Sequence, residues 1–425
     1  IYPSIDLAWQ FSKLNIFLGS PVLTFGKLRL AYGEVGVEPP PFNTQSIYVS
    51  PNYSDSFGGS LSTDLFGAGS FTPSQDLGDP NLSPEIKKEY EVGTDLRFFD
   101  NKIKLGYSYY YNKTEDVFFN LSLANSSGYD EIFTNAGEIE NKGMELDLSY
   151  DIIKNDDFSI NFSLNWSYYR NKVLDLKGVE SIRLGGLSAV SGRAVEGYPL
   201  GVFWGTKFVR NDDGSILLND VGFPSLAPEN GIIGNPHPDW QGGFGTTISY
   251  KDLSLFFLLE TYQGADIYAG TKAVLLNYGR HKDSGIETTT QQDLFDYNGG
   301  LITSGSTFRG SIHDFGAGPV ALTEAWYRGI GGYFSGVQEQ FVEDGSWSRL
   351  RELTLSYSLR SSNFKKATKL SSIDFSFTGR NLFILTDFVG NDPDTNLTEV
   401  STTRGIDYFN NPGTKSYVFK ITINY

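Results

Sequence analysis

The sequence predicts an all-β protein, a transmembrane antiparallel β-barrel with long loops at one end and short turns at the other. Three observations predict this fold. Apolar and polar residues alternate with period two in eleven segments, most of these segments are long, and short and long connections alternate between them. Because successive side chains of a strand point to opposite faces, the alternation gives one apolar wall and one mostly polar wall.

Ten segments precede the last one and carry the pattern in chain order. They cover residues 5–12, 27–32, 89–98, 103–112, 144–152, 158–168, 244–250, 253–259, 352–360 and 373–380. The segment 158–168 is the most regular, since Phe, Ile, Leu, Trp and Tyr alternate there with Ser and Asn. The hairpin across 251–252 is less regular, because Phe256 and Leu258 fall on the side that is otherwise polar.

The eleventh segment, residues 414–425, closes the chain with an uninterrupted alternation. Its apolar face holds Tyr417, Phe419, Ile421, Ile423 and Tyr425. Its other face holds Ser416, Val418, Lys420, Thr422 and Asn424. We expect the first set to face lipid, with Tyr425 at the periplasmic rim.

A soluble β-sandwich also alternates, so strand length and side-chain type decide between the two folds. The runs have about 9 to 14 residues, as membrane strands require, whereas the average strand has about 5 to 6. The apolar faces of the best runs carry no charge, and a mid-bilayer Lys or Arg would cost about 2–4 kcal/mol. Aromatic residues gather near the run ends, as in interfacial girdles: Trp166, Tyr168 and Tyr169 at one end, Phe98, Phe99, Phe158 and Tyr250 at the other. The membrane barrel is therefore favoured.

The connections indicate the orientation of the barrel. Short ones lie at 100–102, 154–157 and 251–252, intermediate ones at 13–24 and 361–372, and long ones at 35–84, 118–140, 172–238, 268–345 and 387–413. Outer-membrane barrels have short periplasmic turns and long extracellular loops, so we assign every long connection to the extracellular side. The strand-like segment 197–210 is expected to be an extracellular excursion or a loop hairpin, with a pair of spanning strands as the alternative.

The strand count predicts that the barrel is incomplete. Eleven is odd, whereas bacterial barrels close with even numbers and leave no strand edge in lipid. We expect the missing strands to precede Ile1.

Composition excludes several classes of function. The net charge is −16, which argues against nucleic acid as a partner. There is no Cys, the three His residues lack metal-ligand spacing, and no nucleophile motif appears, so we predict neither a catalytic residue nor a metal site nor a cofactor. The segments 211–215 and 391–394 could offer oxygens to a structural calcium ion, but Asn, Asp, Pro and Gly are also the residues that turns require. The turn interpretation is favoured.

Two sets of residues are candidates for binding. Aromatic residues in the long loops could stack on sugar rings, although loop packing is the simpler interpretation for each: Trp204, Trp240, Trp326 and Tyr327. Carboxylates on the polar face cluster on neighbouring strands: Glu89, Glu91, Asp95, Glu145, Asp147 and Asp151. We expect these to pair with cations such as Arg97 and Lys104 or to hold a plug, and a role in cargo binding is the less favoured alternative.

Several ordered segments resemble the carboxy-terminal half of SusC/RagA-type TonB-dependent outer-membrane transporters. They are YPSIDLAWQFS, GKLRLAYGEVG, GDPNLSPEIKKEYEVGTDLRFFDNKIKLGYSYYYNKTEDVFF, SSGYDEIFTNAGEIENKGMELDLSYD, EGYPLGVFWGTKF, IIGNPHPDWQGGFGTTISYKDLSLFFLLETYQGADIY, DGSWSRLRELTLSYSL and FTGRNLFILTDFVGNDPD. The resemblance covers essentially the whole chain. It implies a barrel of about 22 strands, of which about eleven are present here, with the plug and the first strands amino-terminal to this chain.

The resemblance also implies a function. It predicts import of large nutrients, usually oligosaccharides and in some members peptides, with a SusD-like lipoprotein as a lid and energy from the TonB complex. A dimer of transporter–lipoprotein pairs in the outer membrane is a further expectation. Two alternatives stay open: a barrel of the same ancestry that acts as a surface receptor or as part of a secretion assembly, and a siderophore or cobalamin transporter.

Overall fold

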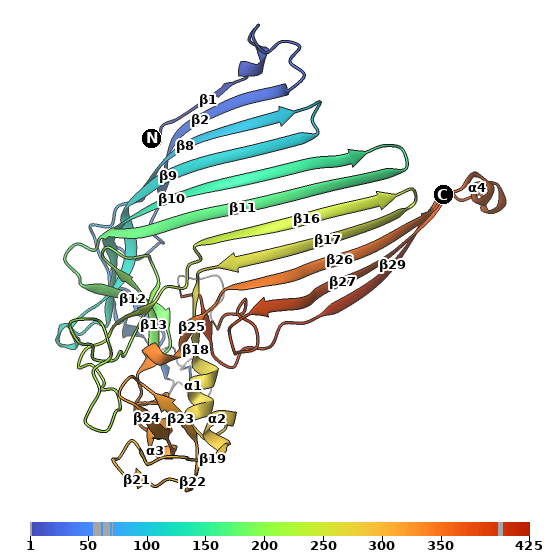
Figure 1. Cartoon of the computed structure of the whole chain (residues 1–425). Helices are drawn as coiled ribbons and strands as arrows, with labels where there is room; N and C mark the ends of the chain where they lie inside the picture. Colours follow the sequence, from blue (N-terminus) through green and yellow to red (C-terminus); the bar gives the residue numbers. More distant parts are fainter. Residues whose placement is uncertain (1, 54–60, 63–68, 70, 398–402) are drawn as a thin grey trace.

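One large antiparallel sheet dominates the computed structural model, which describes residues 2–53, 61–62, 69, 71–397 and 403–425. Its eleven long strands pair in chain order: β1 (Ser4–Trp9), β2 (Leu23–Val37), β8 (Glu85–Phe98), β9 (Ile103–Ser122), β10 (Glu131–Lys154), β11 (Phe158–Asp175), β16 (Trp240–Tyr250), β17 (Leu253–Gln263), β26 (Trp347–Leu359), β27 (Ser372–Thr386) and β29 (Ser416–Asn424). The predicted number of long strands is confirmed for these residues. The sheet curves as a partial barrel whose outer strands are β1 and β29 (Figure 1).

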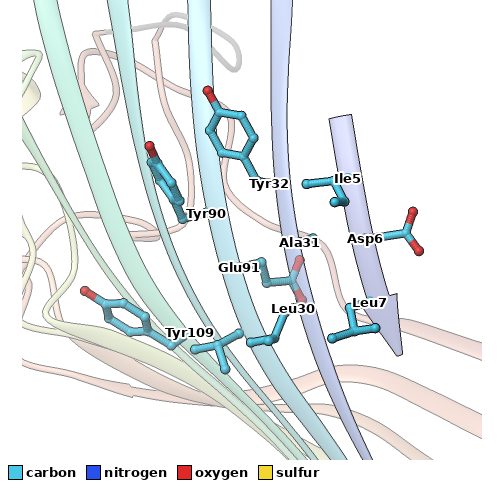
Figure 2. A pocket seen from close by; sticks show the side chains of 10 residues that line it. Ile5, Asp6, Leu7, Leu30, Ala31, Tyr32, Tyr90, Glu91 and Tyr109 are labelled. Atoms are coloured by element: carbon cyan, nitrogen blue, oxygen red, sulfur yellow. The ribbon is translucent and has the colours of Figure 1, made fainter. Parts of the chain in front are cut away.

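The apolar residues of the long strands lie on one face of this sheet. The strand register aligns them in rows, such as Leu7, Leu30, Val92 and Tyr109 on four neighbouring strands. On β29, Tyr417 and Phe419 each keep 64% of their surface exposed. Figure 2 shows the same face at β1, where Ile5 lies toward Tyr32 and Leu7 toward Leu30, while Asp6 points away. Such a continuous exposed apolar surface suits the hydrocarbon of a bilayer.

A row of tyrosines ends the apolar face on the side of the long loops. Tyr32, Tyr90 and Tyr111 are register partners across β2, β8 and β9, and the rings of Tyr32 and Tyr90 are 4.8 Å apart. Two residues beyond this row the same face is charged, with ion pairs such as Lys88–Glu115 and Lys113–Glu138, each at 2.7 Å. The strands therefore leave the hydrocarbon at this row. Tyr169, which we expected in this girdle, lies instead on the polar face, because its neighbour Tyr168 occupies the apolar one.

The connections separate the two ends of the sheet (Figure 1). Short turns at 99–102, 155–157 and 251–252, the turn 10–22 with helix η1 (Phe11–Lys13), and the connection with helix α4 (Ser362–Thr368) lie at one end, together with the C-terminus. Connections 38–84, 176–239, 264–346 and 387–415 lie at the other.

The predicted loop 118–140 is wrong in extent. Strands β9 and β10 continue as a hairpin to residues 123–130, which include helix η3 (Asn125–Ser127). Phe119, Ala136 and Ile139 are buried there against loop residues. Loop residues cover the hairpin on the face that is polar in the rest of the barrel. Apolar residues are therefore buried on that face as well, and the period-two alternation is lost from the hairpin sequence.

The long connections fold into a domain with small sheets of its own. One sheet has the order β12 (Ser181–Gly186), β13 (Val190–Val195), β14 (Val202–Gly205), β15 (Gly231–Gly234), and a second has the order β25 (Val342–Asp344), β18 (Asp266–Ala269), β28 (Ile406–Asp407). Hairpin pairs add β19 (Glu287–Thr289) with β22 (Thr307–Arg309), β20 (Leu294–Phe295) with β21 (Leu301–Ile302), and β23 (Ser311–Asp314) with β24 (Pro319–Leu322). The predicted excursion at 197–210 is thus the β14 strand of a loop sheet.

The described part of residues 38–84 contributes only short strands. These are β3 (Tyr48–Val49) paired with β6 (Thr72–Pro73), β4 (Asn52–Tyr53) paired with β5 (Leu61–Ser62), and β7 (Asp76–Leu77), which joins the start of β10. No helix in the described parts of the chain is long and apolar enough to cross a membrane.

A hydrophobic core holds the loop domain together, and we call it the loop core. It joins helices α1 (Gly270–Asn277), α3 (Glu324–Arg328) and η4 (Gln338–Phe341) to the two loop sheets, with helix α2 (Lys282–Gly285) beside them. Phe203, Tyr268 and Ile406 are fully buried in it, and they come from three different connections. These three connections therefore form one packed unit.

The two faces of the sheet make different predictions for an added charge. Leu164 lies on the apolar face between Leu148 and Phe244, and Ser163 lies beside it on the polar face. We expect Leu164→Arg to destabilise the full-length barrel in lipid vesicles by about 2–4 kcal/mol, because the guanidinium would enter hydrocarbon. The urea midpoint of the folded form, read by gel mobility, measures this loss. Ser163→Arg is the matched control, and an equal loss in both variants would contradict the assignment of the faces.

Candidate functional site

The polar face of the sheet carries charged side chains that pair across strands at the amino-terminal side. Arg29 of β2 lies 3.3 Å from Glu91 and 3.4 Å from Asp95, both of β8. Lys27 lies 3.4 Å from Asp95, its register partner, and Glu89 pairs with Lys87 at 2.6 Å. The expectation that these carboxylates pair with cations is therefore met by Lys27, Arg29 and Lys87. Arg97, the expected cation, lies instead over the ring of Phe25 at 5.0 Å.

A groove on this face brings two of the predicted carboxylates together. Asp95 and Asp147 line it with Lys27, Arg97 and Lys104. The two acids come from β8 and β10, which are separated by β9, and Gly106 of β9 leaves the space between them open. Because the groove carries side chains of both charge signs, it is better suited to contact water or a polypeptide surface than to bind an ion of one sign.

The remaining carboxylates on β10 have neutral register partners. Glu145 stands opposite Ser108 and Ser167, and Asp147 stands opposite Gly106 and Asn165. Asp151 accepts a 2.7 Å hydrogen bond from the amide of Asn161 and lies 3.5 Å from Lys154. These three side chains therefore line the polar face along β10, but the structure does not gather them into one site.

A row of aromatic rings and arginines crosses the polar face near the loop domain. Tyr169 of β11 accepts a 3.2 Å hydrogen bond from Arg404, whose guanidinium lies 5.8 Å from the ring of Tyr262. Tyr262 stacks on Trp347 with ring centres 6.0 Å apart and planes 12° apart. Arg349 and Arg351 lie over Trp347 at 5.1 and 5.4 Å. We call this set the aromatic–arginine row.

The row fixes the connection 387–415, which we call the strap, to the wall of the barrel. Arg349 forms an ion pair with Asp392 in which both side chains are more than nine-tenths buried. Arg351 bonds Glu260 of β17 at 2.5 Å and Asp394 of the strap at 3.1 Å. Arg404, farther along the strap, donates to Tyr169 of β11. The strap is thus clamped at two places, at Asp392 and Asp394 by arginines of β26 and at Arg404 by β11.

The clamp and a local turn account for the two Asp-rich segments. Asp392 and Asp394 of 391–394 face arginines, and Asp213 of 211–215 accepts hydrogen bonds from Ser215, which lower the pKa of that carboxyl. No group of three or more His, Cys, Asp or Glu side chains suited to a metal ion occurs in the described part of the chain.

A directed chain of hydrogen bonds joins the barrel to the loop 176–239. Arg404 donates to the Tyr169 oxygen. The Leu200 carbonyl can only accept, so the proton of the neutral His237 ring is on Nε2, and Nδ1 accepts from the Tyr169 hydroxyl at 3.3 Å. His237 Nε2 then donates to the Leu200 carbonyl at 2.6 Å. Burial, with Arg404 and Arg170 nearby, lowers the pKa of His237, so the neutral imidazole is the form that this chain holds.

The four predicted loop aromatics occupy three different environments. Trp326 and Tyr327 are 2% and 5% exposed in the loop core, where Trp326 packs on Phe223, Tyr297 and Phe315, so neither ring is available to a cargo molecule. Trp240 is not a loop residue: it begins β16 on the apolar face, by its register with Phe244. Trp204 lies half-buried on β14 beneath the guanidinium of Arg193, at 5.1 Å. Only Trp204 keeps a position from which it could contact cargo.

Sequence reasoning missed the aromatic–arginine row. Glu260 and Tyr262 continue the polar-face parity of the predicted strand 253–259 just beyond its end, and that parity was the available signal. A β-bulge beside Arg351 shifts the strand register. The alternation that correctly puts Leu353 on the apolar face therefore does not predict the face of Arg349 or Arg351.

Breaking the clamp should release the strap. Asp392→Ala removes the buried counter-charge of Arg349 and leaves only the more distant Asp394, at 3.9 Å. Loss of one partner of a buried ion pair costs up to about 3–5 kcal/mol. Hydrogen exchange in residues 387–397 and 403–415 of the full-length protein should then be at least 100-fold faster. The double variant Arg349→Met with Asp392→Leu removes both charges and should recover most of the protection. Unchanged exchange in Asp392→Ala would show that the pair does not hold the strap.

Acidification should loosen the His237 contact. The folded protein lowers the pKa of His237 below the value of about 6.5 that an unfolded chain has. The stability contributed by the neutral ring is therefore fully present above that pH and is lost as pH falls from there toward the lowered pKa of the folded state. We expect faster hydrogen exchange of residues 198–201 and 235–239 at pH 5.5 than at pH 7.5.

Matched variants isolate this effect. His237→Asn should abolish the pH dependence, and His313→Asn, at an exposed position, should keep it. Burial raises the pKa of the nearby Asp266, and that group acts in the opposite direction, so an increase that survives in His237→Asn would refute the assignment to His237.

Comparisons with known proteins agree with this architecture. The family model described as TonB dependent receptor-like, beta-barrel matches residues 2–257. TonB-dependent receptor P3 of Formosa agariphila is 26% identical over all of this chain and 42% of its own length. TonB-dependent receptor SusC of Bacteroides thetaiotaomicron is 23% identical over 92% of this chain and 37% of its own length.

A solved structure has the same fold. The structure described as the RagAB peptide transporter superposes with a TM-score of 0.72 at 19% identity, over 100% of this chain and 43% of that one. This chain therefore spans less than half the length of these relatives. Together with the family match, the architecture assigns the chain to the TonB-dependent receptor family of outer-membrane β-barrels, among relatives of the SusC/RagA type.

Proposed function

We propose that this chain is the carboxy-terminal part of a barrel that imports a large nutrient, an oligosaccharide, across the outer membrane. The observation that carries the proposal is the packed loop domain standing over the polar face of a wide sheet, in a chain of this family. An importer of large cargo needs a wide polar interior and a shaped mouth, and it needs no catalytic group. Further strands close the sheet at β1 and β29, and a plug fills the closed barrel against the charged polar face.

The partners follow from the same proposal. A SusD-like lipoprotein covers the long-loop end, and the TonB complex supplies energy from the periplasmic side, where the short turns and the C-terminus lie. The similarity to SusC and to the RagAB structure supports both partners. A peptide is the second candidate for cargo, because RagAB is described as a peptide transporter.

A cryo-EM map of the full-length protein purified from its native outer membrane tests this function. We expect a closed barrel of about 22 strands with a plug inside and a lipoprotein across the loop domain. Cells that lack the protein, or whose TonB is inactivated, should lose uptake of labelled oligosaccharide to a similar degree. A barrel without a plug, or uptake that does not need TonB, would overturn active import and favour a receptor or a secretion component.

A further inference from the structure

The loop sheet β12–β15 has one apolar face and one face with polar residues, which also holds the buried Ser191 and Val202. This second face, called the polar face here, has no assigned role. Ile182 and Ala194 on the apolar face are packed against the barrel hairpin, and Phe203 on the same face is buried in the loop core. Arg183, Arg193 and Trp204 share the opposite face, by the register of β12, β13 and β14. The sheet lies at the long-loop end of the barrel, since β12 begins six residues after β11 ends at Asp175 (Figure 1).

Two arginines stand directly opposite each other on this polar face. Arg183 and Arg193 are register partners across β12 and β13. Side chains at such positions are about 5 Å apart at Cβ, where like charges destabilise the pair. Among the described residues, no carboxylate comes within 4.0 Å of either guanidinium. Eight other arginines form ion pairs with carboxylates in the described part of the chain.

The guanidinium groups have donors to spare. Arg193 donates one hydrogen bond to Ser181 Oγ at 2.8 Å, and its Nε is buried without a hydrogen-bond partner. Arg183 is exposed and donates to the Gly186 carbonyl at 2.9 Å. Burial and the neighbouring Arg183 lower the pKa of Arg193, and Glu180 offsets only part of this effect. An anion placed between the two groups would remove this repulsion and accept charge-assisted hydrogen bonds.

Trp204 adds an apolar surface to the pair. Its ring lies 5.1 Å below the Arg193 guanidinium, which fixes the arginine in a plane. Because Trp204 is half-buried, part of the ring stays accessible beside the charges. A carboxylate matches the planar fork of an arginine, and the apolar face of a sugar ring matches an indole. The combination suits a sugar that carries its own carboxylate.

We propose that Arg183, Arg193 and Trp204 form a subsite for the carboxylate of an acidic, uronic-acid-containing oligosaccharide at the mouth of the barrel. This inference rests on the proposed function and narrows its cargo. The two arginines bind the carboxylate, and Trp204 contacts the adjoining ring. Ser181 positions Arg193 and does not itself contact the sugar.

Calorimetric titration of the full-length transporter in detergent tests the subsite, with hexagalacturonate, a neutral hexasaccharide and a sulfated hexasaccharide as probes. We expect hexagalacturonate to bind at least tenfold more tightly than the neutral probe at low salt, and the sulfated probe to bind more weakly than hexagalacturonate. Arg183→Gln and Arg193→Gln should each weaken hexagalacturonate binding at least tenfold and leave the affinity for the neutral probe unchanged. Arg193→Lys keeps the charge but loses the planar fork, so it should recover only part of the affinity.

A matched variant controls for folding and for general charge. Arg328→Gln removes a solvent-exposed loop arginine whose only described ion pair is with Glu324, and it should change no affinity. Equal affinity for hexagalacturonate and the neutral probe, or equal loss in Arg328→Gln, would overturn the subsite and leave import intact. Tighter binding of the sulfated probe or of an acidic peptide would also overturn it. Failure of the cells to take up any oligosaccharide would count against the proposed function itself.

Discussion

The backbone of a strand in lipid must satisfy every amide and carbonyl within the protein, and the rest of this structure depends on that constraint. It requires long neighbouring strands in register, and eleven such strands follow one another here. Once the hydrogen-bond ladder between the strands is fixed, the position of each residue in its strand determines the face of its side chain. The apolar residues face lipid and the polar ones face inward, so the same register that binds the strands together also prepares a polar surface for function.

Outside the bilayer, at the long-loop end, burial of apolar residues stabilises the structure. There the chain is in water and can bury apolar residues, and the loops pack around Phe203, Tyr268 and Ile406 as a soluble domain would. Charged and polar side chains at the junction connect the loop domain to the barrel strands. The Arg349–Asp392 pair and the Tyr169–His237 chain join the strap and a second loop to barrel strands. The mouth is consequently held in a defined position over the polar face.

The sequence could predict the features that follow from period two and no more. The strands, their faces and the positions of Glu91 and Asp95 obey that period, and the alternating lengths of the connections orient the sheet. The loop core obeys no period, because its residues meet from distant connections, so Trp326 and Tyr327 could not be distinguished from exposed aromatics. Trp240 was wrongly predicted to be a loop residue, because β16 begins earlier than its alternation suggests. The row around Trp347 depends on a bulge and on the strap, which no local pattern encodes.

The position of Ile406 in the loop core has a consequence for the order of assembly. This residue comes from the connection between the last two strands, yet it packs with Val190 from a connection that ends before β16. Loop closure over such separations is slow, and a core that lacks a central member exposes its apolar neighbours. The mouth therefore cannot mature loop by loop as the chain is made. It is complete only once the connection between β27 and β29 has packed into it and buried Ile406.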